Sequence, residues 1–157
     1  MRKQTCKSHH SLLKIFTVTV VAWCASSAFS ADEPPVVKKI LQKAGNECAT
    51  FNGGEFHVAE SAITWHDFTG DGQAEAVVDA SRFSCSTGAS LWGGSGGTYV
   101  WVIVDGKSYE YLAHKWRVID IDGQKVLLLA VHHSECGEMI GPCYRALVWD
   151  NGFRSTQ

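Results

Sequence analysis

Oxygen-bearing side chains recur at alternate positions of one short segment, Asp67-Phe68-Thr69-Gly70-Asp71-Gly72-Gln73-Ala74-Glu75. Several oxygen ligands drawn from one tightly folded segment are typical of calcium sites, and Gly70 and Gly72 would permit the sharp turn that such a loop needs. We therefore predict a candidate calcium site that stiffens the loop rather than performing chemistry, with ligands from Asp67, Thr69, Asp71, Gln73 and Glu75. The alternative is an Asp-Gly-rich turn held by hydrogen bonds from the backbone to these side chains.

A second cluster combines residue types that ligate zinc or copper: His132-His133-Ser134-Glu135-Cys136, with Cys143 seven residues later. This spacing matches no standard zinc pattern, and cysteines of an exported chain favour pairing with each other. A metal-dependent enzyme that uses His132 and His133 is therefore an alternative to an ordinary structural role for these histidines.

Residues for a hydrolytic triad are present but scattered along the chain: His57, His66, His114 and His132, with Asp79 or Glu135 and Ser84, Ser86 or Ser95. The Gly-x-Ser-x-Gly elbow that exposes a nucleophilic serine is missing, because Gly94-Ser95-Gly96 lacks the outer spacing and no helix follows it. We expect no catalytic activity and no catalytic residues.

The uncharged segment from Ser84 to Gly97 contains five glycines and reads as a long loop. Loops of this length in compact domains are usually functional or disordered. An exposed tryptophan on such a loop is a plausible contact residue. We predict a partner-binding site at Leu91, Trp92, Gly94 and Ser95. The alternative is a loose connection whose Trp92 folds back onto the sheet.

The elements that must position these groups are mostly β-strands. Apolar residues at helical spacing over 36–45, after Pro34-Pro35 and up to Gly45, predict one short N-terminal helix. Runs rich in valine, isoleucine, tryptophan and tyrosine, separated by glycine-containing turns, predict strands over 61–68, 74–83, 98–104, 107–113, 116–121, 125–132, 144–149 and 152–155. Asp105-Gly106, Asp122-Gly123 and Asp150-Asn151-Gly152 are typical of hairpin turns. We therefore expect a mainly β fold, an antiparallel meander or small sandwich of about 7–8 strands.

Residues 1–30 have the three parts of a secretory signal peptide. Basic residues begin it, the apolar run 15–25 follows, and Ala28-Phe29-Ser30 supplies the small residues of a cleavage site. The apolar run is shorter than the roughly 20 residues that span a bilayer, so we expect no membrane span in the mature chain. Residues 31–157 would then form a single disulfide-stabilised β domain in the periplasm or secreted. The segment before Cys24 faintly resembles a lipoprotein box, but Trp23 is large where that box has a small residue.

Removal of residues 1–30 takes four basic residues and leaves 10 basic against 16 acidic residues, a formal charge of −6. Such a chain lacks the clustered lysine and arginine that bind nucleic acid, and suits a basic partner surface. Four cysteines remain, which in an exported chain indicate two disulfides. Of the three possible pairings we favour Cys136–Cys143, across a short glycine-containing loop, and Cys48–Cys85 by default. The alternative is four reduced thiols.

The 67–75 segment resembles the loop of FG-GAP or VCBS-type repeats, which lies between two β-strands. It differs from that pattern at Thr69, where Asp or Asn is usual, and at Glu75, which replaces Asp. Only one copy is present, so a propeller of repeats cannot be built.

The whole mature chain resembles a group of small exported bacterial proteins that have one Asp-x-x-Gly-Asp-Gly loop, a following Gly-rich loop and a Gly- and Cys-containing turn before the last hairpin, here 135–143. That resemblance implies a shared β fold and no activity. More loosely, the chain is similar in kind to periplasmic inhibitors and immunity proteins, which plug cell-wall hydrolases with a protruding loop. We therefore expect a non-enzymatic protein-binding domain whose partner is an exported hydrolase or toxin. A calcium-stabilised structural or adhesion-type domain is the alternative.

Overall fold

The computed structural model describes residues 33–137 and 143–156. The expected signal peptide over 1–30, Cys24 and the Gly141-Pro142 part of the expected turn lie outside the described residues.

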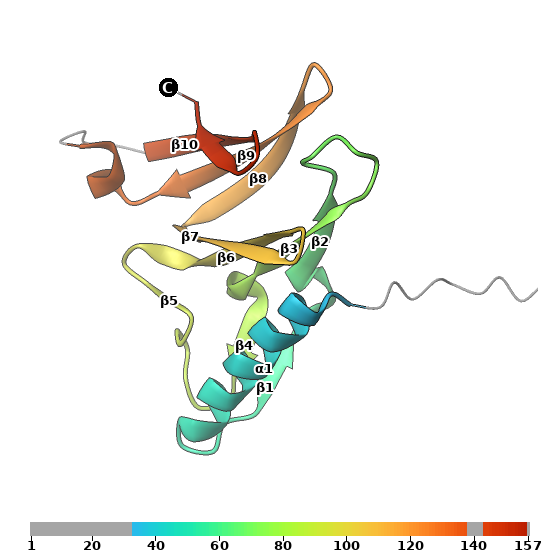
Figure 1. Cartoon of the computed structure of the whole chain (residues 1–157). Coiled ribbons are helices and arrows are strands. Elements are labelled where there is room, and N and C mark those ends of the chain that lie inside the picture. The colour runs from blue at the N-terminus through green and yellow to red at the C-terminus, as the bar shows by residue number, and fades with distance from the viewer. Residues whose placement is uncertain (1–32, 138–142, 157) are drawn as a thin grey trace, which may run out of the picture. The chain divides into compact units, whose positions relative to one another are not determined.

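The described part of the chain is mainly β, as predicted, with one α-helix and three antiparallel sheets (Figure 1). It contains more strands than the seven or eight expected, because two very short strands lie in segments without a strand pattern and one expected strand is broken by a 3-10 turn. The strands are β1 (Phe56–Val58), β2 (Ile63–His66), β3 (Glu75–Asp79), β4 (Phe83–Cys85), β5 (Gly93–Gly94), β6 (Gly97–Val104), β7 (Lys107–Ala113), β8 (Lys115–Ile121), β9 (Gln124–Val131), β10 (Cys143–Trp149) and β11 (Phe153–Ser155). Short 3-10 helices occupy Glu60–Ala62, Ala80–Arg82 and His133–Cys136.

Helix α1 (Pro35–Thr50) begins at the predicted proline but continues past Gly45, where the sequence predicted its end. Val37, Ala44 and Cys48 of one face are buried, so tertiary packing sustains the last turn. The helix terminates before Asn52-Gly53, whose positive φ angles of 55° and 69° turn the chain away.

The five-stranded sheet (β2, β3, β5, β6 and β7) lies between two apolar cores. Alternate residues of β6 serve the two cores, since Val100, Val102 and Val104 pack toward the four-stranded sheet of β8–β11. Ile103 and its neighbours on the other face belong to the second core, which includes Val37 of α1. Helix α1 and the small β1–β4 sheet therefore cover one side of the five-stranded sheet, and β8–β11 cover the other (Figure 1).

Hairpin turns join β6 to β7 and β8 to β9, as the sequence predicted. Both residues of Asp105-Gly106 and of Asp122-Gly123 have positive φ, the conformation that matches the twist of paired strands.

Both expected disulfides are present, with Cα–Cα distances of 5.6 Å for Cys48–Cys85 and 6.0 Å for Cys136–Cys143. The first joins the last turn of α1 to the end of β4, and the second joins the 3-10 helix 133–136 to the start of β10.

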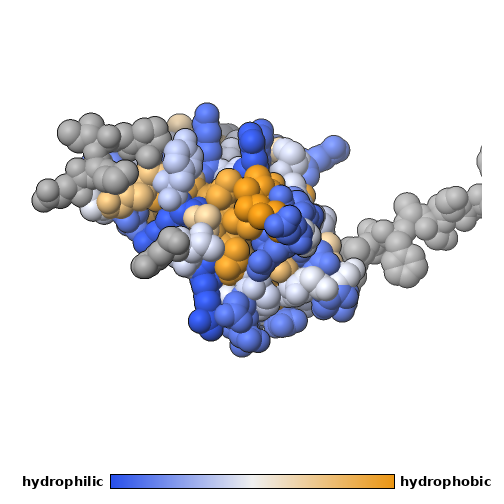
Figure 2. Space-filling model, turned by 90° about the horizontal axis from the view of Figure 1, so that it is seen from above, coloured by the Kyte–Doolittle hydropathy of each residue, from blue (hydrophilic) through white to orange (hydrophobic). Residues whose placement is uncertain are grey.

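The four-stranded sheet is apolar on both faces. Leu127 and Leu129 of β9 are buried in the first core, whereas Val126, Leu128 and Ala130, on the other face of the strand, lie outside both core clusters, with Val126 buried and the other two half-buried. Figure 2, which looks down on the molecule from the top of Figure 1, shows an apolar area bordered by hydrophilic residues.

Candidate functional site

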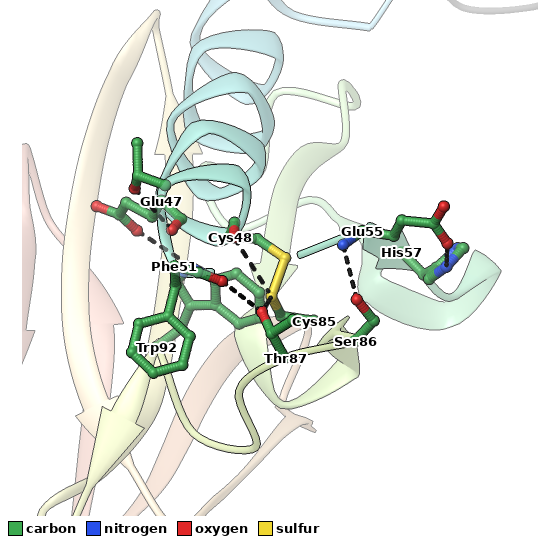
Figure 3. Close-up of a disulfide and its surroundings, with 10 residues drawn as sticks. Glu47, Cys48, Phe51, Glu55, His57, Cys85, Ser86, Thr87 and Trp92 are labelled. Atoms are coloured by element: carbon green, nitrogen blue, oxygen red, sulfur yellow. Dashed lines mark hydrogen bonds and ion pairs between the residues drawn. A yellow bond between two sulfur atoms is a disulfide. The ribbon is translucent and has the colours of Figure 1, made fainter. Parts of the chain in front are cut away.

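Trp92 is buried, with 6% of its surface exposed, so the prediction of an exposed contact residue is wrong. Its ring packs edge-on against Phe56 and Phe83, with centroid distances of 5.2 and 5.5 Å. The indole Nε1–H donates to Glu47 Oε2 at 3.1 Å (Figure 3). A ring of this size gains more from burial in an aromatic cluster than from exposure at a loop tip, and its polar atom keeps a partner.

The loop that carries Trp92 is fastened at its base to the end of α1 (Figure 3). Cys85 is disulfide-bonded to Cys48, and the Thr87 hydroxyl donates to the Phe51 carbonyl at 2.5 Å. Two hydrogen bonds join Ser86 to Glu55. The Ser86 N–H donates to the Glu55 carbonyl at 3.0 Å, and the Glu55 N–H donates to the Ser86 hydroxyl oxygen at 2.8 Å. This part of the expected long loop is therefore held in place rather than protruding.

The far end of the same loop is also paired, because Gly93–Gly94 forms β5 against Gly97 and Thr98. Leu91 is half-buried, and Gly94 and Ser95 are exposed. Of the four residues predicted to bind a partner, the structure leaves these three accessible to different degrees and buries most of Trp92.

A groove of about 630 Å³ separates α1 from strands β6 and β7, and the Trp92 loop forms one of its walls. The helix contributes Ile40, Lys43, Ala44, Glu47 and Thr50, and further lining comes from Phe51, Leu91, Trp92, Tyr99, Trp101, Ser108 and Glu110. The groove exists because α1 covers only part of this face of the sheet.

Aromatic rings form a stacked row along this face of the sheet. Tyr99 and Trp101, two residues apart on β6, stack with centroids 5.4 Å apart and an angle of 22° between ring planes. Phe83 stacks on Trp101 at 6.4 Å and 19°. Phe51, at the end of α1, is 44% exposed and adds an accessible ring.

Two carboxylates are positioned in the groove by the indoles of its tryptophans. Glu110 Oε2 accepts from Trp101 Nε1 at 2.7 Å, and Glu47 Oε2 accepts from Trp92 Nε1 at 3.1 Å. Glu110 retains a second oxygen, whereas Glu47 Oε1 lies 3.8 Å from the Nζ of Lys43, the one cation that the described residues contribute to the groove lining. Aromatic faces combined with carboxylates favour a cationic or amphipathic ligand.

The acidic loop gathers the predicted carboxylates together. One oxygen each from Asp67, Asp71 and Glu75 lie within 4.8 Å of one another. Gly70 and Gly72 adopt positive φ angles of 77° and 86°, a conformation that glycine reaches without a steric penalty. The sharp turn predicted at these two glycines is therefore present.

The acidic loop also contains the hydrogen bonds from backbone to side chain that the alternative, an Asp-Gly-rich turn, predicted. Asp67 accepts from the N–H groups of Gly70 and Gly72 at 2.7 and 3.0 Å. Glu75 Oε2 accepts from the Phe68 N–H at 2.6 Å, and the Gln73 N–H donates to Asp71 Oδ1 at 2.8 Å. The Thr69 hydroxyl lies 3.3 Å from Glu75 Oε1. The carboxylates therefore order the loop by themselves, whether or not they also hold a cation.

The predicted histidine cluster lacks a metal-ligand set in the described residues. The rings of His132 and His133 lie 3.9 Å apart, but His132 Nδ1 is 2.8 Å from the Ser134 hydroxyl. Cys136 and Cys143 are joined in a disulfide, which removes both thiolates. Among residues 33–137 and 143–156, the acidic loop is the one group in which three such ligands converge.

Asp79, an acid of the hydrolytic alternative, has a structural role. It is buried, its Oδ2 accepts from Trp116 Nε1 at 2.9 Å, and its Oδ1 accepts from the Ser81 N–H at 2.8 Å. It therefore links the five-stranded sheet to β8 and caps a 3-10 turn.

The groove residues on α1 and β7 were missed by sequence analysis. The spacing of Tyr99 and Trp101, two residues apart in one predicted strand, places both rings on the same face. The approach of Glu47 and Glu110 to these rings could be seen only in the tertiary structure.

No helix in the described residues is long and apolar enough to cross a membrane. No protein-family model, curated protein or solved structure matches this chain.

Proposed function

We propose that this chain is an exported, non-enzymatic protein-binding domain whose groove between α1 and β6–β7 receives a basic, partly apolar segment of its partner. The expected signal peptide and the two disulfides support an oxidising compartment outside the cytoplasm.

The observation that carries the proposal is the pair of carboxylates fixed among aromatic rings. Glu47 and Glu110 are held by indole N–H groups before any ligand arrives, so a cationic side chain would not have to order them. The mature chain's charge of −6 would also steer a basic partner toward this surface.

The partner that we propose is an exported cell-wall hydrolase or toxin, for which this chain would act as an inhibitor or immunity protein. The buried Trp92 changes how such a complex would form. Instead of inserting a loop into the enzyme, the domain would accept a protruding basic segment of the enzyme into its groove.

Affinity capture of partners with matched baits tests this proposal. The oxidised protein and a Glu47→Gln/Glu110→Gln variant would be exposed to periplasmic and secreted fractions, with mass spectrometry of what each retains. Glutamine can still accept the indole hydrogen bonds, so the variant removes charge with little change in packing. We expect a basic hydrolase to be retained by the unmodified protein, inhibited by it, and lost from the variant.

A Glu60→Gln bait is the matched control, because Glu60 is exposed and lies on a 3-10 helix away from the groove lining. Equal retention of the same proteins by all three baits would contradict the groove assignment. Retention without inhibition would contradict the inhibitor role but not the binding role.

We propose calcium stabilisation as a second role, located at the acidic loop. The convergence of Asp67, Asp71 and Glu75 within 4.8 Å supports it, and ligand-linked stabilisation tests it. This role is independent of the groove and could coexist with it.

A further inference from the structure

The outer face of the four-stranded sheet is apolar without a covering layer in the described residues. Strand pairing places Val126 between Ile119 and Val148, and Leu128 between Arg117 and Ala146. We call the set Lys115, Arg117, Ile119, Val126, Leu128, Ala130, Tyr144, Ala146 and Val148 the outer face.

The apolar members of the outer face lie outside the two packed clusters, although Val126 is buried among its neighbours with 5% of its surface exposed, and Leu128 and Ala130 are half-buried. Antiparallel sheets with one face on a core usually carry polar residues on the other, so an apolar outer face indicates an interaction surface. Tyr144, at its border, is 66% exposed. The apolar area in Figure 2 lies on the side of the molecule where Figure 1 draws these strands.

A hollow of about 340 Å³ lies on this face, lined by Lys115, Trp116, Arg117, Leu128, Ala130 and Tyr144. Its lining is apolar at the centre and cationic at the border. It is therefore shaped to take one apolar side chain beside negatively charged groups.

The two cations of the hollow differ from the other cations of the same sheet. Lys125 pairs with Asp120 at 2.6 Å, Arg145 with Glu135 at 3.4 Å, and Arg154 with Asp150 at 3.0 Å. In contrast, Lys115 and Arg117 form no ion pair or hydrogen bond through their side chains within the described residues.

Lys115 and Arg117 line the same hollow, and no carboxylate of the described residues pairs with either side chain. A partner that supplies carboxylates would complement them. A twofold pairing of two copies through this face would instead bring cationic borders together without supplying an acid.

We propose that the outer face is a second docking surface, and that it binds a protein segment presenting an apolar side chain flanked by carboxylates. The apolar side chain occupies the hollow over Leu128 and Ala130, and the carboxylates pair with Lys115 and Arg117. This surface lies on the opposite side of the five-stranded sheet from α1 and has the opposite charge preference to the groove, so it is independent of the proposed function.

A pair of synthetic peptides tests the docking surface. The probe is Glu-Glu-Leu-Leu-Glu-Glu, and its control replaces every glutamate with lysine. Amide shifts of the isotope-labelled, oxidised protein would be followed by two-dimensional NMR during titration with each peptide. We expect saturable shifts in β8, β9 and β10 with the acidic peptide and none there with the basic peptide.

Two double variants establish which side chains are responsible. Lys115→Glu/Arg117→Glu should weaken the acidic peptide at least tenfold, whereas Lys115→Arg/Arg117→Lys should bind within about twofold of the unmodified protein, because charge rather than fork geometry carries the contact. Lys39→Glu/Lys107→Glu, on α1 and β7, makes the same change of charge at positions that line neither the groove nor the hollow, and should leave the binding of the acidic peptide to β8–β10 intact. All these positions are exposed, and circular dichroism checks that each variant is folded.

Several outcomes would overturn the proposal. One is equal binding of both peptides at this face, and another is the absence of saturable shifts at about 1 mM peptide, which corresponds to weak affinity. Concentration-dependent self-association that Leu128→Ser abolishes would instead assign the outer face to a second copy of the chain.

Discussion

The groove and the outer face are both apolar surfaces with charged borders, but they differ in the sign of their charge and in how firmly that charge is held. In the groove, Glu47 and Glu110 are each fixed by a tryptophan N–H. On the outer face, Lys115 and Arg117 are exposed, and the described residues offer their side chains no hydrogen-bonding partner. Fixed charges lose little entropy on binding and favour specificity, whereas free charges mainly raise the association rate and are screened by salt.

The two surfaces also arise from different strand patterns. Strand β6 alternates valines, which pack toward the four-stranded sheet, with aromatic residues, which face the groove. Strand β9 is apolar at consecutive positions, so its second face is apolar even though no described element covers it. The alternation of valine and aromatic residues in β6 therefore gives a core face and an aromatic groove face. The continuous apolar run in β9 gives a core face and a second apolar face, the outer face.

Replacement of Trp92 should have the largest effect on the free energy of unfolding. It should also distinguish the two surfaces, because Trp92 forms part of the groove wall and is not part of the outer face. We expect Trp92→Ala to lower the free energy of unfolding by about 3–5 kcal/mol, because it leaves a large cavity among Phe56 and Phe83. Chemical denaturation followed by circular dichroism measures this. Trp92→Phe keeps most of the packing and loses the hydrogen bond to Glu47, so it should cost much less. Unchanged stability in Trp92→Ala would contradict the buried position.

The two disulfides should stabilise the domain unequally. Cys48 and Cys85 are 37 residues apart, and Cys136 and Cys143 are 7 apart. Loop-closure entropy then predicts losses of about 4 and about 2 kcal/mol when each pair is replaced by alanine. Denaturant midpoints of the two double variants measure the difference. Loss of Cys48–Cys85 should also weaken binding in the groove, since that disulfide fastens the loop that forms the groove wall. An equal effect of the two double variants on groove binding would contradict this role of Cys48–Cys85.

Charge changes should affect the two surfaces in opposite ways. Glu110→Gln should weaken a basic peptide by up to about fivefold and leave an acidic peptide unaffected, with Arg117→Glu giving the reverse, because each exposed charge contributes up to about 1 kcal/mol. Fluorescence anisotropy over a range of salt concentrations would quantify both. Affinity at the outer face should fall more steeply with salt than affinity in the groove. Identical responses of the two variants would remove the distinction between the surfaces.

Calcium should raise the melting temperature by a few degrees without changing either surface. At a calcium concentration ten times the dissociation constant, linkage gives about 1.4 kcal/mol of stabilisation, which corresponds to a few degrees for a domain of this size. Differential scanning fluorimetry with calcium and then with chelator measures the shift. Asp71→Asn should abolish it and Asp122→Asn, in a hairpin turn, should not. An unchanged melting temperature at millimolar calcium would exclude a useful site.

The smallest effect should be a pH dependence located where the two larger sheets meet. Burial, and after it the positive charge of Lys125, lowers the pKa of the His66 imidazole below its usual value of 6.5. The unfolded chain therefore binds the proton first as the pH falls, so the free energy of unfolding decreases below about pH 6.5 and levels off below the folded-state pKa. Unfolding curves of the protein and of His66→Gln between neutral and mildly acidic pH test this. His57→Gln, at an exposed position, is the control and should keep the pH dependence of the unmodified protein. If His66→Gln also kept that pH dependence, the assignment to His66 would be contradicted.

Local patterns predicted the parts of this protein that depend on neighbouring residues. The β class, the helix start at Pro35 and the Asp-Gly turns follow from periodicity and from the backbone preferences of proline and glycine, which act within a few residues. The clustering of Asp67, Asp71 and Glu75 was predictable for the same reason, because all three belong to one short segment. Gly45 misled the prediction of the helix end, since the burial of Cys48 outweighs the helix preference of one residue.

The sequence by itself therefore determined the class of fold, its turns and the acidic loop, and it favoured the disulfide pairing that the structure contains. Only the tertiary structure decided that Trp92 is buried, that Glu47 and Glu110 meet the aromatic row, and that no element within 33–137 and 143–156 covers the outer face of β9. The physical reason is that these features join residues far apart in the chain, such as Glu47 and Trp92, 45 positions apart. Contacts of that kind depend on which surfaces pack together, and no local periodicity records them.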